Sequence, residues 1–154
     1  MSYQQFYRGA EEAIPPNALK PRGKEIDLRA FVDSNHAGDK TNQRSRTGFM
    51  IFIQNSLICW LSKKQSTIES SVFGAEFVAM KHCMETLRCL RYKLGRMGVP
   101  LSGPSFIYGD NMSVIYNTQR PESMLKKKCN SICYHAVRES VAMGNPSPPT
   151  FERC

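Results

Sequence analysis

A long stretch with helical periodicity is the feature of this sequence that most constrains its fold. Between residues 72 and 94, apolar side chains recur at helical spacing, at Val72, Met80, Cys83, Leu87, Leu90 and Leu94. Gly95 and Gly98 end the run, and Ser66-Thr67-Ile68-Glu69 resembles a capping box that would begin it. The stretch therefore predicts a long helix with one buried face.

Short apolar runs around this helix predict strands. They lie at 28–32, 47–53, 57–61 and 105–109, and Gln54-Asn55-Ser56 makes a hairpin of the second and third. Asn111 or Ser113 is expected to cap a helix after the fourth strand, and a last helix is expected at about 122–142. The order strand, strand, strand, helix, strand, helix, helix predicts an α/β domain with a mixed sheet. Trp60 and Tyr108 are expected in its core.

The length of 154 residues suits one domain with tails. Proline-rich stretches set the expected boundaries: a flexible lead-in at 1–25, a folded domain at 26–143 and a disordered tail at 144–154. Hydrophobic residues at 41% and charged residues at 22% are ordinary for a globular protein.

Charge and targeting signals narrow the class of protein. The net charge of +8 suggests a polyanionic partner such as nucleic acid. The start resembles no signal peptide, and the longest uncharged stretch, Thr47 to Ser62, is too short for a membrane span. We therefore expect an intracellular protein, cytoplasmic or nuclear, whose six cysteines are reduced thiols. Cys129, Cys133 and His135 could form half of a zinc site, but no second pair completes it.

Three acidic residues occupy unusual places in this pattern. Glu76 lies within the apolar stripe of the long helix, and Asp33 and Asp110 each follow directly on an apolar strand. The carboxyl ends of neighbouring parallel strands meet at one edge of a sheet, where binding sites collect. The three carboxylates would converge there if the strands are neighbours, and Mg²⁺ or Mn²⁺ would relieve their repulsion. The alternative is that both aspartates are turn or cap residues and Glu76 faces solvent.

Five motifs, in order, resemble the ribonuclease H domain of copia-type retrotransposon polyproteins. They are Asp33-Ser34-Asn35-His36-Ala37-Gly38-Asp39 with Arg46-Thr47-Gly48, Cys59-Trp60-Leu61-Ser62-Lys63-Lys64-Gln65, Ser70-Ser71 with Ala75-Glu76, Tyr108-Gly109-Asp110-Asn111-Met112-Ser113, and Lys126 to Glu139. The resemblance implies a ribonuclease H-like fold with three antiparallel strands and a parallel fourth beside the first. It also implies cleavage of the RNA strand of RNA–DNA hybrids, and a reverse transcriptase domain in the same polyprotein.

The same resemblance implies the site residues. Asp33, Glu76 and Asp110 would be the catalytic residues and the ligands of a two-metal site for Mg²⁺ or Mn²⁺. The expected contacts to nucleic acid are Lys40, Arg44, Arg46, Lys63, Lys64, Asn111, Lys126, Lys127 and Lys128.

The sequence departs from the resembled family after Glu139. The family continues with a strand and a helix that carries a fourth acidic residue, whereas residues 143–154 match neither. Two functions therefore stay open: a metal-dependent ribonuclease, or a catalytically impaired remnant that acts only as a basic nucleic-acid-binding or structural domain.

Overall fold

A computed structural model of the chain describes residues 12–39, 41–119 and 131–143. Its sheet has strands β1 (Leu28–Asn35), β2 (Arg46–Ile53), β3 (Ser56–Lys64) and β4 (Phe106–Tyr108) in the order β3-β2-β1-β4. β1 and β2 are antiparallel, as are β2 and β3, whereas β4 runs parallel to β1. The predicted mixed sheet, with three antiparallel strands and a parallel fourth beside the first, is confirmed.

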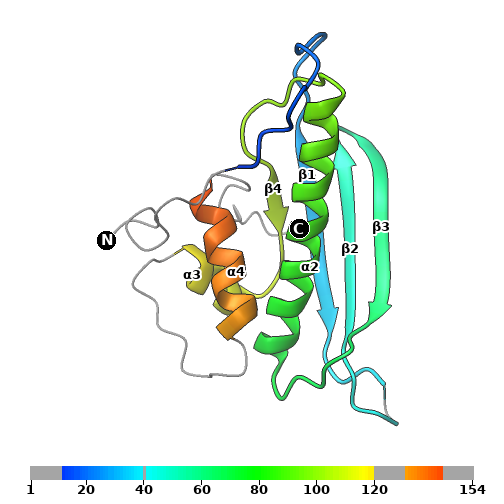
Figure 1. Cartoon of the computed structure of the whole chain (residues 1–154). Helices are drawn as coiled ribbons and strands as arrows, with labels where there is room; N and C mark the ends of the chain where they lie inside the picture. The colour runs from blue at the N-terminus through cyan, green and yellow to red at the C-terminus, as the bar shows by residue number, and fades with distance from the viewer. Residues whose placement is uncertain (1–11, 40, 120–130, 144–154) are drawn as a thin grey trace.

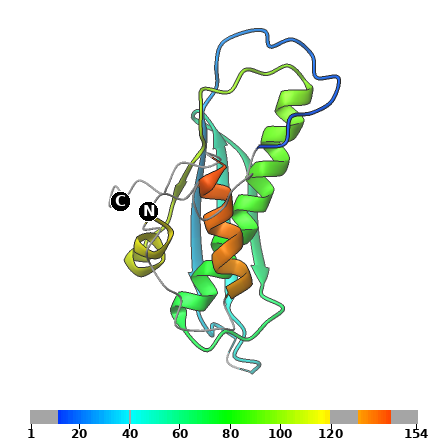
Figure 2. The same cartoon turned by 60° about the vertical axis from the view of Figure 1, so that its left-hand side comes forward.

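Helices cover one face of this sheet. α2 (Val72–Arg96) lies along β1 and β2, and α4 (Ser131–Ala142) packs on the side of α2 (Figures 1 and 2). The short α3 (Met112–Gln119) follows β4 and contacts both helices. Together they enclose a core of apolar side chains from the sheet and from α2.

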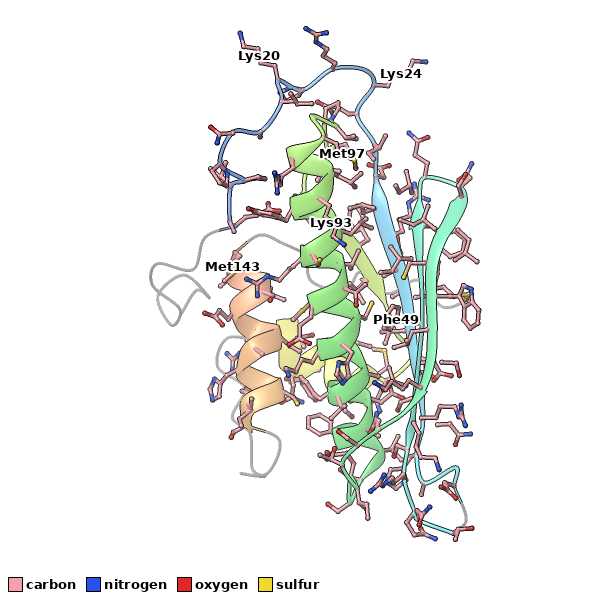
Figure 3. The ribbon with its side chains drawn as sticks, turned by 45° about the vertical axis from the view of Figure 1, so that its right-hand side comes forward. Lys20, Lys24, Phe49, Lys93, Met97 and Met143 are labelled. Carbon is pink, nitrogen blue, oxygen red and sulfur yellow. The ribbon has the colours of Figure 1, made fainter. Side chains whose placement is uncertain are left out.

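The core follows from strand alternation and helical periodicity. Leu28, Ala30 and Val32 of β1 point toward α2 and are buried, and Phe49 of β2 lies between the sheet and that helix (Figure 3). From α2 the buried set includes Met80, Cys83, Leu87 and Leu94, as the stripe predicted. Val72, by contrast, is half exposed, because it lies in the first turn of the helix.

The opposite face of the sheet carries apolar side chains that no described helix covers. Trp60 is 69% exposed there, so its predicted place in the core is wrong. The register explains the difference: Trp60 pairs with Met50, and both point to the face away from α2. Tyr108 is partly buried on the same face, where its ring stacks on Phe31 with centroids 5.0 Å apart.

The predicted start of the long helix is also wrong. α2 begins at Val72 with Ser71 as its N-cap, whose hydroxyl accepts a hydrogen bond from the amide of Gly74. The carbonyl of Glu69 instead accepts a hydrogen bond from Nε2 of His36, at 2.9 Å. Residues 66–70 thus lie outside the helix, and Glu69 makes a tertiary contact there. The last helix is described only from Ser131, and residues 122–130 of its expected range lie outside the described chain.

The segment before β1 lies against the far end of α2. Glu12 accepts a 2.7 Å hydrogen bond from Nε of Arg91, and the amide of Arg22 bonds to the carbonyl of Gly98. Lys20, Lys24 and Met97 all lie toward the end of the molecule where α2 finishes (Figure 3). Residues 1–11 and 144–154 lie outside the described chain, so the proposed lead-in and tail stay predictions.

Candidate metal centre

The register between β1 and β4 brings two aspartates to one edge of the sheet. Phe31 pairs with Tyr108, and Asp33 and Asp110 each lie two residues beyond that pair. Because the two strands are parallel neighbours, these residues occupy equivalent positions at adjacent strand ends. Both side chains are exposed.

Glu76 reaches the same point from the helix layer. It is the fifth residue of α2 and only 6% exposed. One oxygen from each of Asp33, Glu76 and Asp110 lies within 4.8 Å of the other two. The convergence that the strand ends and the helical stripe suggested is therefore present in the structure.

Burial and neighbouring charge make Glu76 a weak acid at this site. Its pKa is raised to about 7, first because burial removes water from the carboxylate and then because Asp110 and Asp33 repel its charge. The neighbouring polar groups of Ser34 partly oppose the rise in the pKa of Glu76. In the described chain, no ion pair joins any of the three carboxylates to a basic side chain.

This donor set fits a hard divalent cation. Three carboxylates with no basic partner repel one another, and a metal ion would supply the missing positive charge. Oxygen-only ligands suit Mg²⁺ or Mn²⁺ better than they suit zinc, which prefers nitrogen and sulfur. Of all acidic, histidine and cysteine side chains in the described residues, only these three form such a group.

Comparison with known proteins identifies the fold. The chain superposes on RNase H1 from Halobacterium salinarum with a TM-score of 0.57, 12% identity and coverage of 77% of this chain and 79% of that one. An N-terminal RNase H domain from Mycobacterium tuberculosis gives a TM-score of 0.59, 10% identity and coverage of 83% and 88%. The chain has a ribonuclease H-like fold.

Sequence comparison points to retroelements. Over 123 residues, 80% of this chain, it is 29% identical to the retrovirus-related Pol polyproteins from transposons RE1 and RE2 of Arabidopsis thaliana. It is 27% identical, over 119 residues, to that from transposon TNT 1-94 of Nicotiana tabacum. The chain spans only 8% of the length of the two Arabidopsis polyproteins. No family profile matches the sequence.

The basic residues predicted to bind nucleic acid divide into two groups in this ribonuclease H-like domain. Arg44, Arg46 and Lys64 line one cavity at the end of β1, and Lys63 is exposed on β3. Lys40, Lys126, Lys127 and Lys128 lie outside the described chain.

Asn111 and His36, which lie near Asp110 and Asp33 in the sequence, make structural contacts. Oδ1 of Asn111 accepts hydrogen bonds from the amides of Ser113, at 3.0 Å, and Val114, at 3.3 Å, and so caps α3 as expected. His36 bonds to the carbonyl of Glu69, and among the described residues no hydrogen bond or ion pair links His36 to the three carboxylates.

Sequence reasoning missed Gln65, which positions the helical carboxylate. Its side chain is buried, and Nε2 donates to Oγ1 of Thr47 at 3.0 Å and to the carbonyl of Ala75 at 2.9 Å. It thereby ties the residue next to Glu76 to β2. Gln65 stood within a recognised motif, but its polar character gave no sign that it was buried.

The cysteines and the helices bear on two further predictions from the sequence. Cys59, Cys83, Cys89 and Cys133 are free thiols, as expected, and Cys129 and Cys154 are outside the described residues. In the described chain, no helix is both long and apolar enough to cross a membrane.

Proposed function

We propose that this chain is a metal-dependent endonuclease that cleaves the RNA strand of RNA–DNA hybrids. It would act within a copia-type retroelement polyprotein, inside the cell, beside a reverse transcriptase domain of the same polyprotein. The observation that supports this most directly is the convergence of Asp33, Glu76 and Asp110 at the strand ends of a ribonuclease H-like fold. The homologous Pol polyproteins support the retroelement context.

The chain's own carboxylates, Asp33, Glu76 and Asp110, would hold Mg²⁺ or Mn²⁺. Metal ions bound there would supply an acidified water and charge stabilisation at the leaving oxygen of an in-line displacement. Glu76 must lose its proton to serve as a ligand, and its raised pKa makes that step pH-dependent near neutrality. Asp33 and Asp110 are exposed, so a phosphate would reach the site from their side.

Substrate binding also has an electrostatic requirement. A nucleic-acid backbone is repelled by three carboxylates, so attraction must come from the metal and from the basic residues nearby. The exposed arginine and lysine side chains at 44, 46, 63 and 64 would supply it. RNA would be distinguished from DNA through its 2′-hydroxyl.

The test is cleavage of a labelled RNA–DNA hybrid by the full chain in Mg²⁺ and in Mn²⁺. Glu76→Gln should abolish cleavage, because it removes a charged ligand while keeping the side-chain shape. Glu85→Gln is the matched control, since Glu85 lies on the same helix, is 52% exposed and pairs with Lys81 at 3.3 Å. Metal-dependent cleavage by wild type and Glu85→Gln alone would support the proposal. Activity in Glu76→Gln equal to wild type would contradict it.

The second candidate is a domain that binds hybrids without cleaving them. The net charge of +8 favours this alternative, because a basic surface attracts a polyanion whether or not cleavage follows. It would bind the hybrid in EDTA with affinity that falls steeply with salt, and would show no cleavage in either metal. Those two measurements on wild type separate the two functions.

A further inference from the structure

A basic cavity lies at the end of β1, where that strand pairs with the start of β2. It has a volume of about 310 Å³ and is lined by Asn35, Gly38, Asp39, Arg44, Arg46 and Lys64. We call these six residues the basic pocket. Three of them are cationic and one is anionic, so the lining carries a net charge of +2.

Local hydrogen bonds build the walls of the basic pocket. The amide of Asp39 donates to the carbonyl of Arg44 at 3.2 Å, and the amide of Gln43 donates to the carbonyl of Asp39 at 2.8 Å. Oδ1 of Asp39 accepts from the amide of Thr41 at 3.1 Å. These contacts tie Asp39 to Thr41, Gln43 and Arg44 and so fix the backbone from which Arg44 projects.

Asp39 is a counter-ion built into the basic pocket. Its Oδ2 accepts hydrogen bonds from Nζ of Lys64 and, at 3.2 Å, from Nδ2 of Asn42. The lysine, then the Thr41 amide and Asn42, hold the pKa of Asp39 well below its usual range. Asp39 is therefore charged at neutral pH. It pairs with Lys64, whose ammonium group an incoming anion could bind instead.

Gly38 keeps open the side of the pocket next to Asn35. A Cβ atom at residue 38 would lie 2.9 Å from Cγ and 3.0 Å from Nδ2 of Asn35. The side-chain amide of Asn35 thus lies directly against Gly38. Its Nδ2 group adds a neutral hydrogen-bond donor to the cationic lining.

The position of the basic pocket relative to the metal centre follows from strand geometry. Asn35 and Asp33 point to the same face of β1, two residues apart, which corresponds to roughly 7 Å along the strand. In the register, Asn35 pairs with Arg46, and Arg46 pairs with Lys64, so all three form one row across the sheet. Consecutive phosphates of a nucleic-acid strand are separated by a comparable distance.

We propose that the basic pocket binds one backbone phosphate of the substrate strand, one phosphate step from the phosphate at the metal centre. Arg44, Arg46 and Lys64 would contact the phosphate oxygens, and Lys64 would exchange Asp39 for phosphate. The strand assignment rests on the proposed function, whereas anion binding by the pocket does not. Phosphate contacts of this kind position a nucleic acid without reading its sequence.

The first test uses inorganic phosphate and the full chain without metal, followed by amide chemical shifts of residues 36–46. Arg46→Gln should weaken binding by about fivefold. Asp39→Asn should strengthen it by about three- to fivefold, the size expected for one solvent-facing charge pair. Asparagine can still accept the Thr41 amide bond, so the turn is kept. Lys93→Gln is the control, since Lys93 lies toward the opposite end of the molecule (Figure 3).

The two variants are expected to change phosphate affinity in opposite directions, weaker in Arg46→Gln and stronger in Asp39→Asn. Weaker or unchanged phosphate binding in Asp39→Asn would overturn the proposal, and so would an Arg46→Gln affinity equal to that of Lys93→Gln. A loop that merely loosens would weaken binding in both variants.

The second test places the pocket on the substrate strand. RNA–DNA hybrids are prepared with one neutral methylphosphonate at successive positions of the cleaved strand, and binding is measured in EDTA. Wild type should lose about fivefold in affinity at one position adjacent to the cleavage site, and Arg46→Gln should lose nothing further there. The salt slope of Arg46→Gln should be smaller by about one.

The outcomes distinguish this inference from the proposed function. Phosphate binding with the expected signs, but no cleavage, would contradict only the nuclease. Cleavage that depends on Glu76, together with no methylphosphonate effect specific to Arg46, would contradict only the placement of the pocket on the substrate strand.

Discussion

Glu76 lies in the second turn of α2, where its helical position would ordinarily hold an apolar side chain. The folded protein buries it beside Asp33 and Asp110, so in the absence of metal the neutral form is favoured. The same arrangement that suits metal binding therefore makes this carboxyl costly to ionise.

A pH prediction follows from this burial. The pKa of Glu76 is about 7 in the folded protein and about 4.5 when unfolded, so the folded state binds the extra proton between these values. The contribution of the protonated Glu76 to the free energy of unfolding is fully present below pH 4.5 and is lost as pH rises through 7. At pH 8 in EDTA, Glu76→Gln should be more stable than wild type, by at most on the order of 3 kcal/mol.

Urea denaturation between pH 5 and 8 measures this difference. Glu85→Gln should follow wild type at every pH. Adding Mg²⁺ at pH 8 should stabilise wild type but not Glu76→Gln, because only the wild type retains all three ligands. Equal pH slopes for wild type and Glu76→Gln would contradict the raised pKa.

At the scale of the element, the start of α2 shows how a tertiary contact overrides a local signal. Ser66 to Glu69 has the spacing of a capping box, yet the hydroxyl of Thr67 bonds to the Glu69 side chain, and the Glu69 carbonyl bonds to His36. The helix begins only after these contacts, at Val72. This placement sets Glu76 five residues into the helix, opposite the ends of β1 and β4.

Two serine variants test which residue caps α2. Ser71→Ala should destabilise the protein by about 1 kcal/mol, because the amide of Gly74 loses its acceptor. Ser66→Ala, at an exposed position outside the helix, should change stability by less than ~0.5 kcal/mol. Thermal or urea denaturation measures both, and a larger loss in Ser66→Ala would contradict the assigned cap.

At the scale of the whole molecule, the sheet has one face covered by helices and one bearing exposed apolar side chains. Phe49 and Trp60 lie close in the sheet, since their strands are paired, but the first is 4% exposed and the second 69%. Alternation along paired strands separates them onto opposite faces.

The two aromatic residues should therefore differ strongly on substitution. Phe49→Ala should cost about 3–5 kcal/mol, as for other large residues removed from a core. Trp60→Ala should cost less than ~1 kcal/mol, because most of its surface already contacts water. Comparable losses of unfolding free energy in urea for both variants would show that this face is covered in solution.

Much of the architecture could be predicted from periodicity and residue order alone. The runs at 28–32, 47–53 and 57–61 and the helical stripe after residue 72 predicted the strands and the long helix, since these depend on local spacing. The order of the elements predicted a mixed sheet, and the family resemblance implied which strands are antiparallel and which is parallel. The resemblance named Asp33, Glu76 and Asp110, and their positions after strands and within the stripe agreed with it. Asp39 and Gln65 were not singled out, because their roles depend on partners distant in sequence.

The sequence by itself thus determined which residues form strands and helices and which carboxylates stand out among apolar neighbours. Only the tertiary structure decided that the three carboxylates meet within 4.8 Å, that α2 begins at Val72 and that Trp60 is exposed. The physical reason is the same in each case. Strand register, the parallel pairing of β1 with β4 and the packing of α2 on one face are long-range contacts, and local spacing does not specify them.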